Sequence, residues 1–298
     1  MKRESVREWI IGALWVIAIS GGLLWWLAWV TGTRGDKATH YVYKHPGGTS
    51  LMISVYQPDD WKPSDRRPCV VWFFGGGYET GGPAQMAEAA KRMARRGLVA
   101  VTADYRVRLR HGSVTPLDAV KDARSAVRWV KLHADQMGIA GDRIAVGGNS
   151  SGGQLALACD LLDGLDESTD NVEISPSPAA LVLFNPLVDF DIPMAREKAV
   201  DLAPGLLESL SPITHLTAPL PPTLILHGEA DRIIPIDSVK AFVEKAKGLG
   251  SPSIEFISYP GKGHEFHLPG FNGNRDFEEA MDRVEDFFEA LGWLPKSK

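Results

Sequence analysis

The feature that most restricts the fold of this chain is a serine between two glycines, in the segment Gly148-Asn149-Ser150-Ser151-Gly152. This segment follows the apolar run Ile144–Val146 and precedes a helix-like stretch at 154–162. Where a strand turns sharply into a helix, the two backbones lie so close together that only glycine fits beside the central residue. The pattern therefore predicts a buried strand, a strained turn with Ser150 at its tip, and a helix whose N-terminus lies beneath that serine.

Two further polar residues follow apolar runs later in the chain. Asp231 lies just past the run Thr223–Leu226, and His264 lies just past the run Ile254–Tyr259. The order Ser, Asp, His is expected when all three residues occupy loops at the C-terminal ends of successive strands. A serine hydroxyl is a weak nucleophile until a base takes its proton. We expect His264 to be that base, and Asp231 to orient the imidazole and stabilise its cation.

A run of glycines supplies a fourth element upstream. Gly75-Gly76-Gly77 comes directly after the apolar strand predicted at Cys69–Phe74. Glycines let backbone N–H groups approach a reacting carbonyl, where such donors stabilise the negative charge that develops on oxygen. We therefore predict an oxyanion hole formed by the N–H groups of Gly76, Gly77 and Ser151.

With these segments the chain resembles the α/β-hydrolase superfamily, in particular its esterases with an HGGG-type glycine loop. These include hormone-sensitive-lipase-like enzymes and bacterial carbohydrate esterases of the acetyl and feruloyl type. The resemblance extends from about Tyr41 to Leu294 and is carried by 74–77, 103–106, 142–146, 148–152, 226–228 with Asp231, and 263–264. The family usually has histidine where this chain has Phe74, and that histidine is understood to brace the loop. We expect Phe74 to brace it by packing instead.

Predicted strands alternate with predicted helices along the chain, which indicates a mostly parallel sheet with helices on both faces. The resemblance implies that this is the α/β-hydrolase fold, over residues 39–298. Strands are expected at 41–43, 51–56, 69–74, 98–103, 143–146, 180–184, 223–226 and 254–259, and helices at 84–96, 116–133, 154–162, 238–249 and 275–291. The Pro-rich segment at about 186–222 is too long for a simple connection, so we expect a small lid-like excursion there.

The N-terminus contains 21 residues without a charge, Ile10–Val30. As a helix this stretch spans roughly 30 Å, the thickness of the hydrocarbon core of a bilayer. It is longer than the apolar region of a cleaved signal peptide, and Val30-Thr31-Gly32-Thr33 is a poor cleavage site. We predict a signal anchor and short linker over 1–38, with the catalytic domain exported to the periplasmic or extracellular side. A cleaved signal, which would make the protein secreted, and a buried core helix are the alternatives.

Composition excludes several other classes of function. A formal net charge of −5 gives no reason to expect a nucleic-acid partner. The 8 histidines are scattered and no C-x-x-C is present, so we predict neither a metal nor a cofactor. The 2 cysteines, Cys69 and Cys159, are expected to be small buried apolar residues rather than a disulfide.

Several neighbouring residues compete with the predicted site residues. Ser151 is a rival to Ser150, but the glycine spacing is symmetric only about Ser150. His267, a surface or pocket-lining residue by our interpretation, competes with His264. Glu229 and Asp237 compete with Asp231, and Asp237 is expected to cap a helix that begins at Ser238. Structural roles are expected for His227 and for Asp104-Tyr105-Arg106, while Tyr78 is expected either to line the pocket or to pack.

Together these residues predict a serine carboxylesterase that hydrolyses short-chain esters through an acyl-enzyme, with Ser150, His264 and Asp231 as its triad. The resemblance and the outward location favour acyl groups on carbohydrates as substrates. Two alternatives remain, a serine exopeptidase on the same fold and a non-catalytic binding protein that keeps the fold.

Overall fold

The computed structural model describes residues 38–193, 195, 203–251 and 253–296. The predicted signal anchor at 10–30 lies outside these residues. Within the described ranges, no helix combines the length and the apolar character that crossing a bilayer requires.

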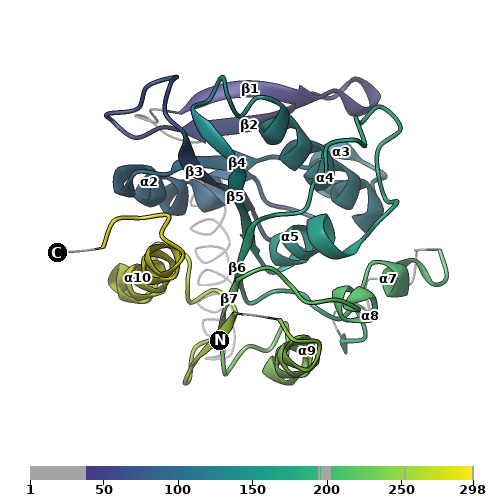
Figure 1. The fold of residues 1–298 in the computed structure, drawn as a ribbon. Coiled ribbons are helices and arrows are strands. Elements are labelled where there is room, and N and C mark those ends of the chain that lie inside the picture. The colour runs from purple at the N-terminus through teal and green to yellow at the C-terminus, as the bar shows by residue number, and fades with distance from the viewer. Residues whose placement is uncertain (1–37, 194, 196–202, 252, 297–298) are drawn as a thin grey trace, which may run out of the picture. The chain divides into compact units, whose positions relative to one another are not determined.

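The described strands form one sheet of eight, in the order β1-β2-β4-β3-β5-β6-β7-β8 (Figure 1). Their bounds are β1 Thr39–Lys44, β2 Leu51–Tyr56, β3 Arg67–Phe73, β4 Val99–Ala103, β5 Ile139–Asn149, β6 Ala180–Phe184, β7 Thr223–Gly228 and β8 Ile254–Tyr259. Strand β2 pairs antiparallel with β1 and β4, and every pair from β4 to β8 is parallel. The predicted mostly parallel sheet is therefore confirmed, with the hairpin of β1 and β2 at one edge.

Helices cover both faces of this sheet. Figure 1 shows α2 and α10 on one side and α4 and α5 on the other. The longer helices are α2 Ala87–Arg96, α4 Pro116–Leu132, α5 Ser151–Leu161, α9 Ile236–Gly248 and α10 Arg275–Ala290, with short helices at α3 Arg108–His111, α7 Leu206–Ser209 and α8 Pro212–His215. Helix α2 ends at Gly97, whose φ of 112° is in the left-handed region that glycine tolerates. Helix α4 begins with a capping box between Thr115 and Asp118.

One predicted cap is wrong. Helix α9 begins at Ile236, with Pro235 at its N-cap position and no side-chain cap, so Asp237 lies inside the first turn. An acidic side chain in the first turn still interacts favourably with the helix dipole. The helix therefore begins at Ile236 rather than at the predicted Ser238.

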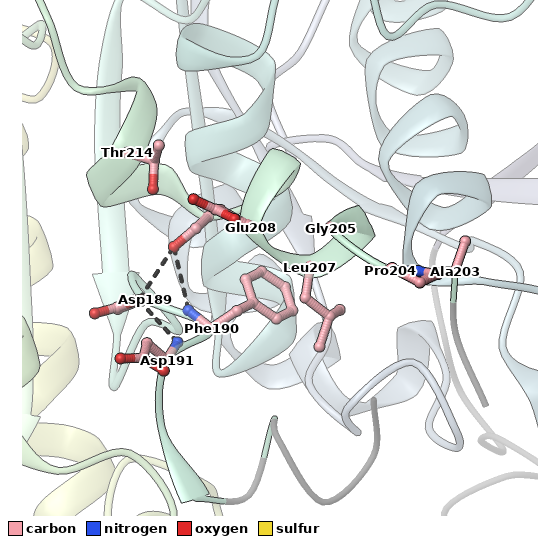
Figure 2. A pocket seen from close by; sticks show the side chains of 10 residues that line it. Asp189, Phe190, Asp191, Ala203, Pro204, Gly205, Leu207, Glu208 and Thr214 are labelled. Atoms are coloured by element: carbon pink, nitrogen blue, oxygen red, sulfur yellow. Dashed lines mark hydrogen bonds between the residues drawn. The ribbon is translucent and has the colours of Figure 1, made fainter. Parts of the chain in front are cut away.

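The segment after β6 leaves the sheet and carries α7 and α8, where the lid-like excursion was predicted. Ile213 at the start of α8 donates its N–H to the Val188 carbonyl at 2.9 Å, which returns the segment toward the end of β6. A cavity of about 530 Å³ lies in this segment. It is lined by Asp189, Phe190, Asp191, Ala203, Pro204, Gly205, Leu207, Glu208, Ser211 and Thr214 (Figure 2). Asp189 accepts hydrogen bonds from the Asp191 N–H and the Ser211 hydroxyl, which order the wall of this cavity.

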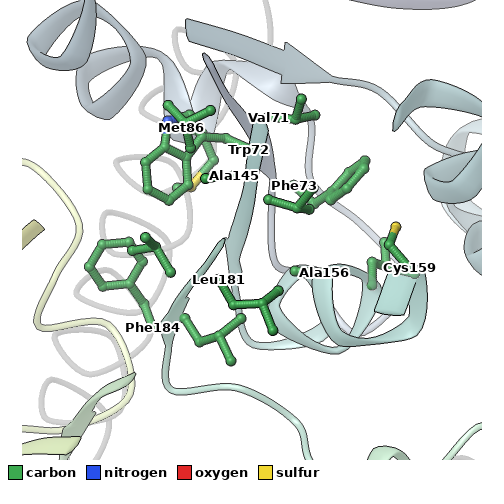
Figure 3. Packing of buried hydrophobic residues seen from close by; sticks show 14 of the residues in the cluster. Val71, Trp72, Phe73, Met86, Ala145, Ala156, Cys159, Leu181 and Phe184 are labelled. Carbon is green, nitrogen blue, oxygen red and sulfur yellow. The ribbon is translucent and has the colours of Figure 1, made fainter. Parts of the chain in front are cut away.

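The core is built on consecutive strand residues that point to opposite faces of the sheet. On β3, Trp72 packs with Phe184 at 6.0 Å between ring centroids, while Phe73 faces α5 near Cys159 (Figure 3). Cys69 and Cys159 are both free and buried, so the prediction of two apolar cysteines is confirmed.

Candidate active site

The turn from β5 into α5 places Ser150 in a strained conformation. Its φ of 56° and ψ of −121° lie where residues other than glycine are rarely found. A Cβ atom on Gly148 would lie 2.6 Å from the Gly152 backbone, and one on Gly152 would lie 2.3 Å from the Phe73 carbonyl oxygen. Both flanking glycines are therefore required by close backbone approach, as the sequence pattern predicted.

Backbone hydrogen bonds hold this turn on both sides. Ser150 donates its N–H to the Phe184 carbonyl at 3.0 Å, and its own carbonyl accepts from Leu187 at 3.1 Å. Both partners belong to the end of β6 or the residues just after it. The serine is thus fixed against the neighbouring strand, which helps to maintain the unfavourable dihedral angles.

Asp231 and His264 meet because their strands, β7 and β8, are adjacent and parallel. The Asp231 Oδ2 atom lies 2.7 Å from His264 Nδ1. The Asp231 Oδ1 atom accepts the N–H groups of Ile233 and Ile234, at 2.8 and 2.9 Å. Burial alone would raise the pKa of Asp231, but His264 and these two N–H groups outweigh burial and lower it.

An ionised Asp231 fixes the tautomer of its partner. A carboxylate can only accept, so His264 carries its proton on Nδ1 and presents Nε2 as a proton acceptor. Among the described residues no hydrogen bond joins the Ser150 hydroxyl to His264. In free enzymes such contacts are often long and shorten only when substrate binds.

The glycine loop after β3 adopts conformations that need glycine. Gly76 has a φ of 142°, and a Cβ atom there would lie 2.2 Å from the Thr80 carbonyl oxygen. Ser151 is the first residue of α5, so its N–H has no acceptor within the helix. The Gly77 N–H donates to the Ser151 hydroxyl at 3.0 Å. For Gly77 to donate to an oxyanion as predicted, its N–H must either share its hydrogen bond between the Ser151 hydroxyl and the oxyanion or give up the bond to Ser151.

Phe74 packs tightly at the start of this loop. Its fully buried ring stacks on Tyr105 with centroids 4.1 Å apart and planes 13° apart. The Tyr105 hydroxyl donates to the Phe74 carbonyl at 2.8 Å. A Cβ atom on Gly81 would lie 2.7 Å from the Phe74 ring, which shows how little space surrounds it.

The residues that competed with Asp231 and His264 in the sequence have other hydrogen-bond and packing partners in the structure. His227 is buried, its Nε2 lies 3.0 Å from the Ile234 carbonyl oxygen, and burial lowers its pKa. His267 is buried rather than on the surface; it stacks on Phe184 at 4.9 Å, and burial lowers its pKa to about 3. Glu229 accepts from the Ser258 hydroxyl at 2.7 Å.

Residues of the segment 104–106 have structural partners, as expected. Asp104 accepts two hydrogen bonds from the Arg110 guanidinium, at 2.6 and 2.9 Å. Arg106 donates to the buried carboxylate of Asp122.

Two residues at the site had not been singled out in the sequence. Asn185 follows the last residue of β6 and contacts both the Gly228 N–H and the His264 carbonyl. Gln154 is fully buried, accepts from the Tyr78 hydroxyl at 3.0 Å and donates to the Leu210 carbonyl at 2.9 Å. Tyr78 itself is buried and stacks on Phe190, a wall residue of the cavity, at 6.3 Å. For Asn185 a signal existed, because it follows an apolar run at a strand end, as Asp231 does.

The described part of the chain contains no group of three or more His, Cys, Asp or Glu side chains placed to hold a metal ion.

Known proteins are similar to this chain over most of its length. The family described as BD-FAE matches residues 53–246. Esterase LipC of Mycobacterium tuberculosis is 29% identical over 242 residues, and esterase LipQ of the same organism is 26% identical over 264 residues. These matches cover 73% and 83% of this chain, but the chain spans only 57% and 61% of the length of those relatives.

A solved structure matches over nearly its whole length. The apo form of Thermogutta terrifontis esterase 2 is 34% identical with a TM-score of 0.82, and the match covers 89% of this chain and 98% of that one.

Proposed function

The chain belongs to the BD-FAE family of α/β-hydrolase esterases, and on that basis we propose that it is a serine carboxylesterase that hydrolyses short-chain esters. The observation that carries the proposal is the Asp231 carboxylate 2.7 Å from His264 Nδ1, at the same edge of the sheet as the strained Ser150 turn. That edge holds the carboxyl ends of parallel strands, where the reactive groups of such sheets are found.

In this proposal the reaction has two halves. The Ser150 hydroxyl oxygen attacks the ester carbonyl while His264 Nε2 takes the hydroxyl proton, and Asp231 stabilises the imidazolium. The oxyanion accepts hydrogen bonds from the N–H groups of Gly76, Gly77 and Ser151. The C–O bond to the alcohol then breaks, and the alcohol leaves with the proton from His264. Water attacks the acyl-enzyme by the same proton transfers, releasing the acid and restoring the serine.

Short acyl groups on carbohydrates are the proposed substrates. The resemblance to carbohydrate esterases inferred from the sequence motifs supports the carbohydrate as the alcohol part of the substrate, and a similar solved structure supports the short acyl part. Thermogutta terrifontis esterase 2 was solved with propionate bound and with butyrate bound, both short-chain carboxylates. Three carboxylates, Asp189, Asp191 and Glu208, line the cavity after β6 and make that cavity unfavourable for anions.

The N-terminal segment is proposed to anchor the enzyme in a membrane, with the catalytic domain on the outer side. The support is the uncharged stretch Ile10–Val30 with basic residues before it. The intact mass of the protein extracted from membranes tests this directly. A mass that includes residue 1 supports the anchor, whereas loss of the first 30 or so residues shows a cleaved signal.

A substrate panel tests the esterase proposal. The full chain and its Ser150→Ala variant are compared on p-nitrophenyl acetate, butyrate and palmitate, on acetylated xylo-oligosaccharides, and on an amino-acid p-nitroanilide. We expect turnover of the acetate, butyrate and sugar acetates, with loss of activity in the variant. Faster turnover of palmitate would overturn the short-chain assignment. Faster turnover of the anilide would indicate an exopeptidase, and no turnover by folded protein would indicate a binding role.

A further inference from the structure

We propose that Asn185 is a positioning residue that holds the loops of Asp231 and His264 in register with the Ser150 turn; the inference rests on the proposed esterase function. Asn185 follows the last residue of β6 and is fully buried. Strand β6 lies between β5, which ends just before Ser150, and β7, which leads into the turn that contains Asp231. The residue is therefore at the centre of the three strand ends that supply the site.

The backbone of Asn185 is held in an unusual conformation. Its φ is 40°, in the left-handed region, and its N–H donates to the Leu226 carbonyl at 2.8 Å. Asparagine tolerates this region better than most residues with a side chain. Such strain persists only where surrounding contacts maintain it, and here the side chain supplies those contacts.

The side-chain amide uses its acceptor and both of its donors. Oδ1 accepts the Gly228 N–H at 2.9 Å, and Nδ2 donates to the His264 carbonyl. Nδ2 also lies 3.3 Å from Nδ1 of the buried His267. The orientation of the amide follows from its partners, because an N–H can only donate and a carbonyl can only accept.

These contacts connect the elements that must act together. Gly228 begins the turn that leads to Asp231, whose N–H returns to the Gly228 carbonyl at 3.2 Å. The carbonyl held by Asn185 belongs to His264 itself, the predicted base. The preceding residue, Phe184, accepts the Ser150 N–H at 3.0 Å. Two consecutive residues therefore fix the backbone of the predicted nucleophile, the base and the turn before the carboxylate.

Loss of the amide is expected to impair turnover more than binding. A displacement of about 1 Å in a reacting group costs on the order of 100-fold in rate. Asn185→Gly removes the amide while keeping a residue that accepts the left-handed backbone. Asn185→Asp keeps the acceptor for Gly228 but loses both donors, so it tests the contact to His264 separately.

Asn274→Gly is the matched control. Asn274 also has a left-handed φ, of 65°, and its Oδ1 accepts a backbone N–H, from Gly270 at 2.5 Å. It lies just before α10, and the hydrogen bond described for its side chain is to Gly270, not to Gly228 or His264. The control therefore repeats the same chemical change without touching the proposed site.

The experiment measures kcat and KM on p-nitrophenyl acetate for the full chain and the three variants, with thermal unfolding to establish that each is folded. We expect kcat to fall about 100-fold in Asn185→Gly and in Asn185→Asp, with KM changed by less than about threefold. Asn274→Gly should keep kcat within about twofold of the parent. A folded Asn185→Gly with an unchanged kcat would overturn the proposal.

A second measurement does not depend on ester turnover. We expect the proton between His264 Nδ1 and Asp231 to give a far-downfield NMR resonance in the parent chain. This resonance should be lost or broadened in the Asn185 variants and retained in Asn274→Gly. If the parent chain hydrolyses no ester, the proposed function fails while this resonance still tests the positioning role. Retention of the resonance in both Asn185 variants would refute that role.

Discussion

Phe74 stands where the resemblance to HGGG-type esterases predicts a histidine, and replacing it gives a quantitative test of how the glycine loop is braced. The Phe74 ring is fully buried and stacks on the Tyr105 ring with centroids 4.1 Å apart. It also lies so close to Gly81 that a Cβ atom on Gly81 would clash with it. Phe→Ala substitutions in cores cost about 3–5 kcal/mol, and an aromatic pair contributes about 1 kcal/mol beyond its buried area. We expect Phe74→Ala to destabilise the fold by about 4 kcal/mol, because its rigid neighbours cannot close the space.

The same substitution should also lower turnover, because Gly75-Gly76-Gly77 starts from this residue. Displacing one oxyanion donor costs about 100- to 1000-fold in kcat, so we expect Phe74→Ala to lose about 100-fold. Phe74→His restores a ring that can stack on Tyr105, so this variant should fold and keep kcat within about tenfold of the parent. Its stability should still fall by about 1–3 kcal/mol if the buried imidazole lacks a full set of partners.

Urea unfolding and steady-state kinetics on p-nitrophenyl acetate, measured on the same preparations, separate the two effects. A folded Phe74→Ala with unchanged kcat would show that the ring does not brace the loop. Complete loss of activity in a folded Phe74→His would show that the loop depends on packing specific to phenylalanine.

Three further predictions concern the site itself. Asp231→Asn should lower kcat/KM by about 10³- to 10⁴-fold in steady-state assays, since the imidazolium loses its counter-charge and the tautomer is no longer fixed; a loss of less than about tenfold would contradict the assignment. The pKa of Asp231 is lowered in the fold, so its ionised form stabilises the protein above about pH 4 and this contribution is lost as pH falls through the folded-state pKa. The urea midpoints of the parent and Asp231→Asn should therefore converge on acidification, and parallel curves would refute the coupling. Ser151→Ala should keep kcat within about tenfold because it retains the backbone N–H, whereas loss of all activity would favour Ser151 as the nucleophile.

Much of this arrangement follows from local sequence signals. The Gly148–Gly152 pattern constrains the turn through backbone contacts of its own residues, which is why the strand, the turn and the helix could all be predicted. The apolar runs before Asp231 and His264 fix their strands, and parallel pairing then places both residues at one edge of the sheet. The bounds of β6 and β8 agree with the predicted runs because both begin and end at changes in apolar character.

Other features depend on contacts between distant segments. Strand β5 begins at Ile139 rather than 143 because Ile139 pairs with Arg67 on β3, across a register irregularity. The role of Asn185 arises from a left-handed φ and from partners 43 and 79 residues away, Gly228 and His264. The bond from Gly77 to Ser151 likewise joins residues 74 positions apart. No local pattern encodes such contacts. The hydrogen bond from the Gly77 N–H to the Ser151 hydroxyl could therefore not be predicted from the sequence.

Covalent labelling tests most directly whether Ser150 is a nucleophile activated by His264. The full chain is treated with paraoxon, which phosphorylates Thermogutta terrifontis esterase 2, and the adduct is mapped by peptide fragmentation. We predict a single diethylphosphoryl adduct on Ser150, absent in Ser150→Ala, retained in Ser151→Ala and formed much more slowly in a His264→Ala variant. An adduct on Ser151, or no adduct on the folded parent chain, would contradict the account.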